Sequence, residues 1–472
     1  MSARAGRLRR RTAFVDPAEF TPQFAWRKSQ RAKSVEHVHC EGVDLVAAGA
    51  SFGTPTYFYS RAAITNACRE FDRGLGKVPH TICFAVKSNG NLSLLNYLAK
   101  SGSGFDIVSG GELEHLGRLG VRGERIVFSG VGKTRHEIRD ALQYSAAARE
   151  RHPKPAKSGI LLFNVESEAE LEVLIEESER HAMRGGKIPA VAIRVNPDVA
   201  AGGHPHIATG SHTHKFGLDW PEARRLYLAH KDSKHLRWKG ISAHIGSQIV
   251  SLDPFRKAFR RIAGYVKELR RAGIPLEYLD LGGGLGVRYT REKTPSREEY
   301  ARMVAECVRP LGLHLLLEPG RSIIASAGIL LTRVIYTKQN RGKTFVIIDA
   351  AMNDLLRPAL YGAIHPITRI VREAGGRKPH AQRVDIVGPV CETGDCLLHD
   401  WPLGEVKAGD LLAIWTAGAY GMTQASNYNA RTRPSEVLID GTKARLIRRR
   451  ETQDDLLRTD ILAPSQGARV LK

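Results

Sequence analysis

The stretch Thr81–Asn89, which reads TICFAVKSN, is an apolar, β-rich run that stops at one lysine, Lys87. Seven further runs of this kind follow along the chain, and segments able to form helices separate them. Buried parallel strands read as nearly continuous apolar runs, so the pattern indicates eight strand and helix pairs and predicts an α/β fold with a (β/α)8 barrel. The eight runs are Thr81–Val86, Phe105–Val108, Arg125–Phe128, Leu161–Val165, Val191–Val195, Ile241–Ile245, Tyr278–Leu281 and Leu313–Leu317.

The residues at or just past the ends of these runs are almost all polar or glycine. In a barrel of this kind the carboxyl ends of the strands carry the chemistry, so these positions are the expected site. Ser167 precedes a segment with helical spacing of apolar residues and is the expected N-cap of that helix. The strand-end residues are Lys87, Ser109–Glu112, Ser129–Gly130, Glu166, Asn196–Pro197, His244–Gln248, Gly282–Gly284 and Glu318–Arg321.

The pattern of expected elements changes after residue 326, where short strands alternate with Gly, Pro and Asp turns. We therefore predict a TIM barrel over residues 56–326 and a second, mainly β domain over 327–472, which residues 34–55 join. A length of 472 residues and a hydrophobic content of 42% allow two globular domains with a substantial core. Residues 1–33 are expected to form a basic, solvated and mobile arm. The strands expected in the second domain include Thr332–Lys338, Thr344–Ala350, Arg383–Val387, Leu411–Thr416 and Glu436–Ile439.

The formal net charge of +22 raises nucleic acid as a partner, but the positions of the charges argue against it. Residues 1–33 hold nine Lys and Arg against two acids and supply +7, and Arg448–Arg450 form a second small cluster. No nucleic-acid motif or basic stripe with interleaved aromatics accompanies them, so we expect no specific nucleic-acid partner. Incidental binding of polyanions and an organellar transit role for the Arg-rich start both stay open.

The sequence also bears on the compartment. It lacks an apolar run of the roughly 18 residues that cross a bilayer, and it lacks an apolar secretory segment near its start. Its six cysteines are dispersed without a CxxC pair, which favours reduced thiols over a disulfide framework. We therefore expect a cytoplasmic protein with no membrane partner.

Three strand ends suggest chemistry on an aldehyde cofactor that carries a phosphate. The amine of Lys87 can condense with an aldehyde, and the backbone amides of Gly282–Gly284 can hold a phosphate in a cup that Gly320 and Arg321 complete. An ionised Glu318 at the end of an apolar run is costly unless paired, and a pyridinium nitrogen is one suitable partner. Taken singly, these residues also fit a solvated lysine, a tight turn and an ion pair with arginine.

Seven motifs, taken in order, resemble those of the diaminopimelate decarboxylase family, and the resemblance runs from about residue 50 to residue 440. It implies an alanine-racemase-like, fold type III decarboxylase that uses pyridoxal 5'-phosphate and shares its active sites between the two subunits of a homodimer. The motifs are Phe84–Asn89, Gly104–Glu112, His244–Gln248, Gly282–Gly284, Glu318–Arg321, Pro389–Asp395 and Gly418–Gly421.

The resemblance also implies roles for individual residues, with Lys87, His244 and Cys391 as the catalytic ones. Lys87 would form the imine with the cofactor, His244 would stack on its ring, and Glu318 would pair with its pyridinium nitrogen. We expect Lys87 and Glu318 to face that ring from opposite rims of the barrel. Cys391 would reach across from the second subunit and donate a proton to the substrate. The implied cofactor contacts are Lys87, Asp106, His244, Ser247, Gly282, Gly283, Gly284, Glu318, Gly320, Arg321 and Tyr420, and the implied substrate contacts are Arg321, Arg357, Tyr361, Glu392 and Tyr420.

The implied reaction is the decarboxylation of meso-2,6-diaminopimelate to L-lysine and CO2, the last step of lysine biosynthesis. The substrate is zwitterionic at both ends, and Arg357 offers the bidentate fork that suits its distal carboxylate. Ornithine lacks that carboxylate and would leave Arg357 unpaired, which argues against the related ornithine and arginine decarboxylases, whereas a carboxynorspermidine decarboxylase stays open. A non-catalytic homologue that only binds the cofactor would be expected to have lost Lys87 or Cys391, and both are present.

The chain departs from the family pattern at Ala208–Gly217, where His214 stands in place of the usual serine. His204, His206 and His212 lie nearby, so this loop offers imidazole ligands for a metal. No acidic or cysteine ligand accompanies the histidines, and we therefore expect no metal there.

Overall fold

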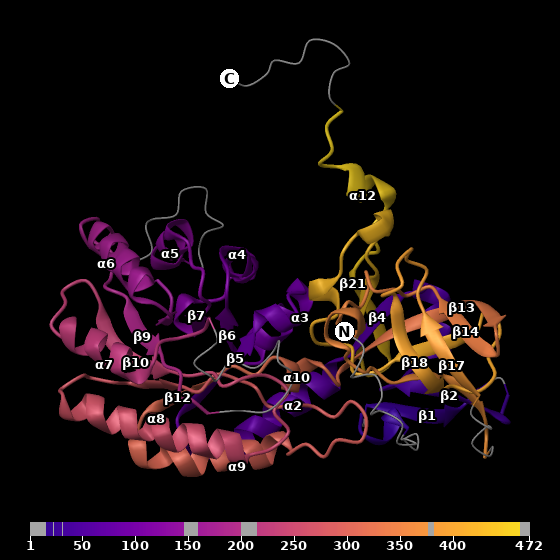
Figure 1. The fold of residues 1–472 in the computed structure, drawn as a ribbon, viewed down its shortest axis with the longest axis horizontal. Coiled ribbons are helices and arrows are strands. Elements are labelled where there is room, and N and C mark those ends of the chain that lie inside the picture. Colours follow the sequence, from indigo (N-terminus) through magenta and orange to yellow (C-terminus); the bar gives the residue numbers. More distant parts are fainter. Residues whose placement is uncertain are drawn as a thin grey trace.

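The computed structural model describes residues 16–21, 23–30, 32–145, 159–199, 215–375 and 382–462. These residues form two domains that lie side by side along the longest axis of the molecule (Figure 1). A closed barrel surrounded by helices occupies one half. A β domain, assembled from segments before and after the barrel, occupies the other half.

Eight parallel strands close the barrel in the order β10-β11-β12-β5-β6-β7-β8-β9, which confirms the predicted (β/α)8 fold. Each of the eight apolar runs overlaps one of these strands, although the sixth strand begins and ends earlier than expected. A register shift at Trp238–Gly240 accompanies this difference. The strands are β5 His80–Ala85, β6 Gly104–Ile107, β7 Ile126–Phe128, β8 Leu162–Val165, β9 Ala190–Arg194, β10 Arg237–Ser242, β11 Tyr278–Asp280 and β12 His314–Leu317.

Amphipathic helices cover the outside of the barrel. In α8 the residues Phe255, Phe259 and Val266 recur at helical spacing and are buried, which is why this segment packs as a helix. The predicted N-cap Ser167 of α6 is confirmed, because its side chain accepts a hydrogen bond from the Glu170 amide at 3.2 Å. The helices of this domain are α2 Arg61–Leu75, α3 Leu92–Lys100, α4 Gly110–Arg118, α5 Arg135–Leu142, α6 Glu168–Ala182, α7 Trp220–Ala229, α8 Asp253–Arg271, α9 Arg297–Val308 and α10 Arg321–Ile324.

The β domain contains a nine-stranded sheet and a four-stranded sheet. The larger sheet follows the order β18-β17-β14-β13-β4-β20-β21, with β19 paired to β13 and β15 paired to β19, and the smaller sheet contains β1, β2, β3 and β16. One buried core that includes Phe24, Phe58 and Trp415 joins elements of both sheets. The elements are β1 Phe24–Lys28, β2 Val35–Cys40, β3 Val43–Asp44, α1 Leu45–Phe52, β4 Thr56–Ser60, β13 Gly328–Asn340, β14 Lys343–Ile348, α11 Arg357–Tyr361, β15 Ile367–Arg369, β16 Val371–Glu373, β17 Arg383–Val387, β18 Cys396–Pro402, β19 Leu411–Ile414, β20 Ser435–Asp440, β21 Lys443–Arg448 and α12 Gln453–Leu457.

The expected arm at residues 1–33 carries structure from residue 16 onward, so this prediction was too broad. Pro17–Glu19 form a short 3-10 helix, and β1 pairs with β2 in the smaller sheet. Phe24 of β1 is 1% exposed and packs edge-on against Trp415, with ring centroids 5.6 Å apart. Burial of this aromatic ring anchors the segment to the domain. Residues 1–15 lie outside the described residues.

The barrel domain begins after Ser60 and not at residue 56 as predicted. Thr56–Ser60 form β4, which lies between β13 and β20 in the larger sheet. All five residues of β4 are buried, so strands on both sides supply its hydrogen bonds and the domain core covers its side chains. The histidines at positions 204, 206, 212 and 214 lie outside the described residues, so the expectation of no metal at that loop stays a prediction.

The structure also bears on the second basic cluster, the cysteines and membrane-spanning helices. Arg448 and Arg449 of the second basic cluster form ion pairs with Glu436 and Asp455, so two of its three charges are paired within the fold. All six cysteines are free thiols. Within the described part of the chain, no helix has both the length and the apolar character needed to cross a membrane.

The β domain docks on the barrel end at which the strands finish. The Tyr420 amide donates to the Ser88 carbonyl at 2.9 Å, and the Asn89 side chain donates to the Gly418 carbonyl at 3.2 Å. These bonds join the segment after β5 to the segment after β19. Residues from both domains therefore meet at one place.

Candidate active site

A cavity of about 810 Å³ lies where the β domain meets the carboxyl ends of the barrel strands. Its volume falls in the range of small-molecule sites. Both domains contribute to its walls, which confirms that the strand ends converge. The predicted site residues that line it are Lys87, His244, Ser247, Gly284, Glu318, Gly320, Arg321, Arg357, Tyr361 and Tyr420.

Lys87 reaches the cavity because β5 ends just before it. The register of β5 and β6 sets Ala85 opposite Asp106, and the Lys87 ammonium donates to the Asp106 carboxylate across 2.9 Å. Desolvation disfavours the charged amine, but Asp106, Tyr420 and Glu318 together outweigh it and raise the pKa of Lys87 above its ordinary value. The second carboxylate oxygen of Asp106 is buried and has no hydrogen-bond partner among the described residues, so it can accept from a ligand.

Glu318 lies beside Lys87, and the expectation that it faces a ring from the opposite rim of the barrel is wrong. β12 ends at Leu317 and pairs with β5, so closure of the barrel makes the ends of these two strands neighbours. Burial, followed by the carboxylates of Asp106 and Asp280, raises the pKa of Glu318 well above its ordinary value. A carboxyl group with a raised pKa is a suitable partner for a basic nitrogen in the cavity.

Asn164 and Asp280 form a buried polar layer beneath Glu318 that the sequence reasoning missed. The Asn164 amide donates to Asp280 at 2.6 Å and to the Ser129 hydroxyl at 3.1 Å. Ser129 in turn donates to Glu318 at 3.2 Å, so the layer fixes the position of the acid. The available signal was a polar Asn164 inside the apolar run Leu161–Val165, because a buried amide needs specific partners.

The glycine loop after β11 approaches its neighbours too closely for side chains. Gly282 and Gly284 have φ angles of +62° and +108°, and a Cβ on Gly283 would lie 2.4 Å from a backbone carbonyl oxygen. The Gly282 amide donates to Asp280 at 2.9 Å, and the Gly283 amide donates to His244 at 3.0 Å. These two amides thus bond within the protein, and Gly284 is the loop glycine that lines the cavity.

His244 faces the cavity as a neutral ring. Desolvation, with the positive charges of Arg194 and Lys87 added to it, lowers the pKa of His244 well below its ordinary value. Because its Nδ1 accepts the hydrogen bond from Gly283, the neutral ring carries its proton on Nε2. A flat, uncharged ring is suited to lie against an aromatic ligand.

Arg321 and Arg357 form a cationic wall, and Tyr289, which was not predicted, joins them. The Tyr289 hydroxyl oxygen accepts from Arg321 at 2.8 Å and from Arg357 at 3.0 Å. Burial would raise the pKa of Tyr289, but the two guanidinium groups lower it overall. Arg321 and Arg357 are 7% and 5% exposed, and within the described residues tyrosines rather than carboxylates surround them. Buried cations without a counter-anion favour a ligand that carries carboxylate or phosphate groups.

Three further predicted residues support this wall. The Ser247 hydroxyl accepts from Arg321 Nε at 3.3 Å and from its Nη2 at 3.1 Å. The Arg321 guanidinium lies 5.0 Å from the centre of the Tyr420 ring. Tyr361 accepts a hydrogen bond from Gln424 at 3.3 Å and lines the cavity beside Arg357.

Cys391 and Glu392 do not line the cavity formed by their own chain. Both are exposed on the turn between β17 and β18, where the Cys391 amide donates to the Asn429 side chain at 2.8 Å. Their exposure leaves them available to a second molecule.

The model of the pyridoxal-dependent decarboxylase family, pyridoxal binding domain, matches residues 61–325. The diaminopimelate decarboxylase of Pseudomonas aeruginosa is 47% identical over 425 residues, which cover 90% of this chain and 97% of the relative. The chain belongs to the diaminopimelate decarboxylase family. A crystal structure of the Helicobacter pylori family member in complex with L-lysine is similar, with 39% identity, a TM-score of 0.80 and coverage of 88% of this chain and 98% of the other. A structure of the M. jannaschii member in co-complex with L-lysine has 34% identity, a TM-score of 0.81 and coverage of 91% and 96%.

The cofactor of this family is pyridoxal phosphate, and the residues of the cavity fit it. Lys87 supplies an amine for the aldehyde, Glu318 supplies a partner for a ring nitrogen, and the neutral His244 supplies a flat surface. The orphaned oxygen of Asp106 marks a position that a ligand donor can satisfy. As a member of the family, the chain is a carboxy-lyase that uses this cofactor.

Proposed function

We propose that the protein decarboxylates meso-2,6-diaminopimelate to L-lysine and CO2, the last step of lysine biosynthesis. The observation that carries this proposal is the pair of buried guanidinium groups of Arg321 and Arg357, bridged by Tyr289 and without a described carboxylate partner. A substrate with a second carboxylate supplies the missing anion. The relatives that share this family are diaminopimelate decarboxylases, and two of the similar structures contain L-lysine, the expected product.

Pyridoxal phosphate, when bound, supplies an electron sink that stabilises the negative charge left on the α-carbon after CO2 departs. Lys87 holds the cofactor through its amine, and Asp106 keeps that amine in place. Glu318 would pair with the ring nitrogen and so strengthen the sink. His244 would hold the ring from one side, and Gly284, Gly320 and Ser247, which line the cavity, would hold the phosphate. These roles follow from the family resemblance and agree with the geometry of the cavity.

Arg357 and Tyr361 bind the distal carboxylate of the substrate, and Arg321 contributes to the same anion site. Tyr420 touches both cofactor and substrate from the β domain. An ornithine or arginine substrate would leave a desolvated guanidinium unpaired, which costs several kcal/mol. A related decarboxylase for carboxynorspermidine is the second candidate, because its substrate also retains a carboxylate.

A second copy of the chain completes the site in this proposal. Cys391 and Glu392 are exposed and lie outside the cavity of their own chain, and the family resemblance implies that they reach the substrate of a second copy. Cys391 of the second copy donates a proton to the α-carbon, and Glu392 binds the distal ammonium. The six free thiols further support a reducing compartment, and we place the enzyme in the cytoplasm.

The direct test supplies the purified enzyme with pyridoxal phosphate and with meso-diaminopimelate, L-ornithine, L-arginine or carboxynorspermidine in separate reactions, and measures CO2 release. We expect turnover with meso-diaminopimelate and formation of L-lysine in equal amount. Preference for ornithine or arginine would contradict the assigned anion site. Binding of the cofactor without turnover of any of the four substrates would favour a non-catalytic homologue.

The shared site has a sharper test. Lys87→Ala and Cys391→Ala variants should each be inactive alone. In a mixture of the two, a heterodimer pairs the intact Lys87 of one subunit with the intact Cys391 of the other. Random exchange of equal amounts should therefore restore about a quarter of the wild-type activity. A mixture that stays inactive after confirmed subunit exchange would refute the shared site.

A further inference from the structure

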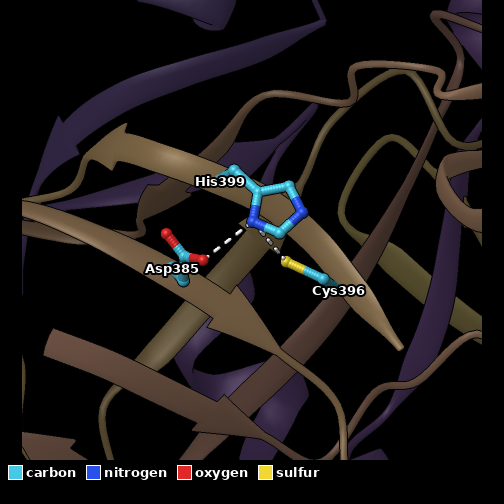
Figure 2. Close-up of side chains that lie close together, drawn as sticks. All are labelled: Asp385, Cys396 and His399. Carbon is cyan, nitrogen blue, oxygen red and sulfur yellow. Dashed lines mark hydrogen bonds and ion pairs between the residues drawn. The ribbon is translucent and has the colours of Figure 1, made fainter. Parts of the chain in front are cut away.

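Three side chains of different chemistry meet at the base of the hairpin formed by β17 and β18 (Figure 2). Asp385 lies in β17, whereas Cys396 and His399 lie in β18. The His399 Nδ1 atom is 2.8 Å from an oxygen of Asp385 and 3.3 Å from the sulfur of Cys396. One ligand atom from each residue lies within 4.8 Å of the other two, and none of the three residues lines the active-site cavity.

Irregular strand pairing brings these side chains together. The four residues Val384–Val387 of β17 pair with the six residues Cys396–Trp401 of β18 through two register shifts. In a regular strand, residues 396 and 399 would point to opposite faces, because side chains alternate. The extra residues re-aim the side chains, so that both Cys396 and His399 point at Asp385 (Figure 2).

The donor set matches zinc. A thiolate and an imidazole favour zinc over the harder calcium and magnesium ions, and a carboxylate is a third common zinc ligand. In a tetrahedral shell, neighbouring ligand atoms lie roughly 3.3–3.7 Å apart, so the closest pair here must separate by about half an ångström. The His399 side chain is 74% exposed and has room to make this shift. A water molecule would complete the shell.

Lys343 would compete with a metal ion for the carboxylate of Asp385. Its ammonium lies 2.6 Å from the same Asp385 oxygen that contacts His399. Its side chain is 53% exposed and ends on a flexible stem, so it can turn into water when a divalent cation replaces it. Removal of Lys343 should therefore strengthen metal binding, whereas removal of a ligand should weaken it.

We propose that Asp385, Cys396 and His399 bind one zinc ion. On binding, the Cys396 thiol releases its proton to solvent, and the Lys343 ammonium leaves Asp385. The ion links the two strands that flank the turn at residues 388–395, which carries Cys391 and Glu392. Zinc thus restrains the turn that presents these two residues to a second copy.

The test titrates zinc chloride into the chelator-treated holoenzyme and measures bound metal by equilibrium dialysis. We expect one zinc per chain, with affinity lowered at least about tenfold by Cys396→Ser and by His399→Gln. Lys343→Gln should raise the affinity severalfold. Cys307→Ser, which alters a partly buried thiol in α9 of the barrel, is the matched control and should leave binding unchanged.

Two readouts distinguish this site from other zinc ligands. Cobalt bound in place of zinc should show thiolate-to-metal charge-transfer absorption that is lost in Cys396→Ser. Zinc should also slow hydrogen exchange at residues 388–395 in the wild type and not in that variant. Zinc binding that survives both ligand substitutions, as expected if the histidines at 204–214 held it, would overturn the proposal. Absence of zinc binding would identify the three residues as a hydrogen-bonded cluster and would overturn it equally.

Discussion

Replacing Arg357 by methionine should weaken the use of diaminopimelate about a hundredfold while leaving the ligand-free fold no less stable. Arg357 is 5% exposed, and its guanidinium is 3.0 Å from the Tyr289 hydroxyl. Loss of one partner from a desolvated guanidinium–carboxylate pair costs about 3 kcal/mol, which corresponds to about a hundredfold in KM. Stability should not fall, because the substitution removes an unbalanced buried cation that lies close to Arg321.

The assay measures KM and kcat for CO2 release from meso-diaminopimelate, together with the melting temperature of the enzyme without substrate. Arg357→Lys keeps the positive charge but loses the planar fork, so its KM should lie between those of the wild type and the methionine variant. Arg302→Met alters an arginine whose side chain is 60% exposed and serves as the control, with kinetics like the wild type.

Two outcomes would refute this reasoning. A KM within twofold of the wild type for Arg357→Met would show that the distal carboxylate binds elsewhere. A parallel fall of melting temperature and activity would show that Arg357 supports the fold and not the substrate. A rise in KM with an unchanged or higher melting temperature is the result that separates substrate binding from structural support.

The other predictions concern the imine-forming lysine, the bridging tyrosine and a buried histidine. Lys87→Ala should abolish turnover and the absorption of the lysine-bound cofactor; measurable turnover would contradict its role. Tyr289→Phe removes the hydroxyl that holds Arg321 and Arg357 in place. The lost hydrogen bonds are worth about 1.5 kcal/mol, so KM for diaminopimelate should rise about tenfold, and kcat should change less. Desolvation and the charge of Arg357 lower the pKa of His365 from 6.5 to about 3. The unfolded chain therefore binds this proton at a higher pH than the folded chain does, and stability should fall as the pH drops from about 6.5 toward 3. The free energy of unfolding, measured with urea, should fall less over this pH range for His365→Gln than for the wild type. The same pH dependence in both proteins would refute the assignment.

The ends of the apolar runs could be placed from the sequence because strand periodicity and length are local properties. Lys87, His244 and Glu318 each lie at or just past the end of an apolar run, and parallel strands must bring such positions to one end of the barrel. Which of them are neighbours depends on closure of the sheet. The pairing of β12 with β5 makes residues 87 and 318 adjacent although they are far apart in the chain.

Short segments with distant partners escaped the sequence reasoning. β4 has five buried residues, but the strands that flank it, β13 and β20, come from the far end of the chain. Phe24 is likewise buried in a core that includes Trp415, which is far away in the sequence. A stretch of this kind carries no periodic signal that tells its final sheet, so its domain could not be assigned locally.

Within the site, the contacts of Tyr289 could not be predicted from the sequence either. Nothing in its neighbourhood along the chain predicts that it accepts from both Arg321 and Arg357, because the three side chains come from separate segments. The same holds for Asp385, Cys396 and His399, whose meeting depends on register shifts between two strands.

The sequence by itself determined the eight-stranded barrel, the amine and acid at two of its strand ends and the family to which the chain is similar, because runs of residues and ordered motifs are local and readable. Only the tertiary structure decided that Lys87 pairs with Asp106, that burial raises the pKa of Glu318, and that Arg321 and Arg357 lie buried without a carboxylate partner among the described residues. Desolvation and the distances between charges set these properties, and both arise only when distant segments of the chain pack together.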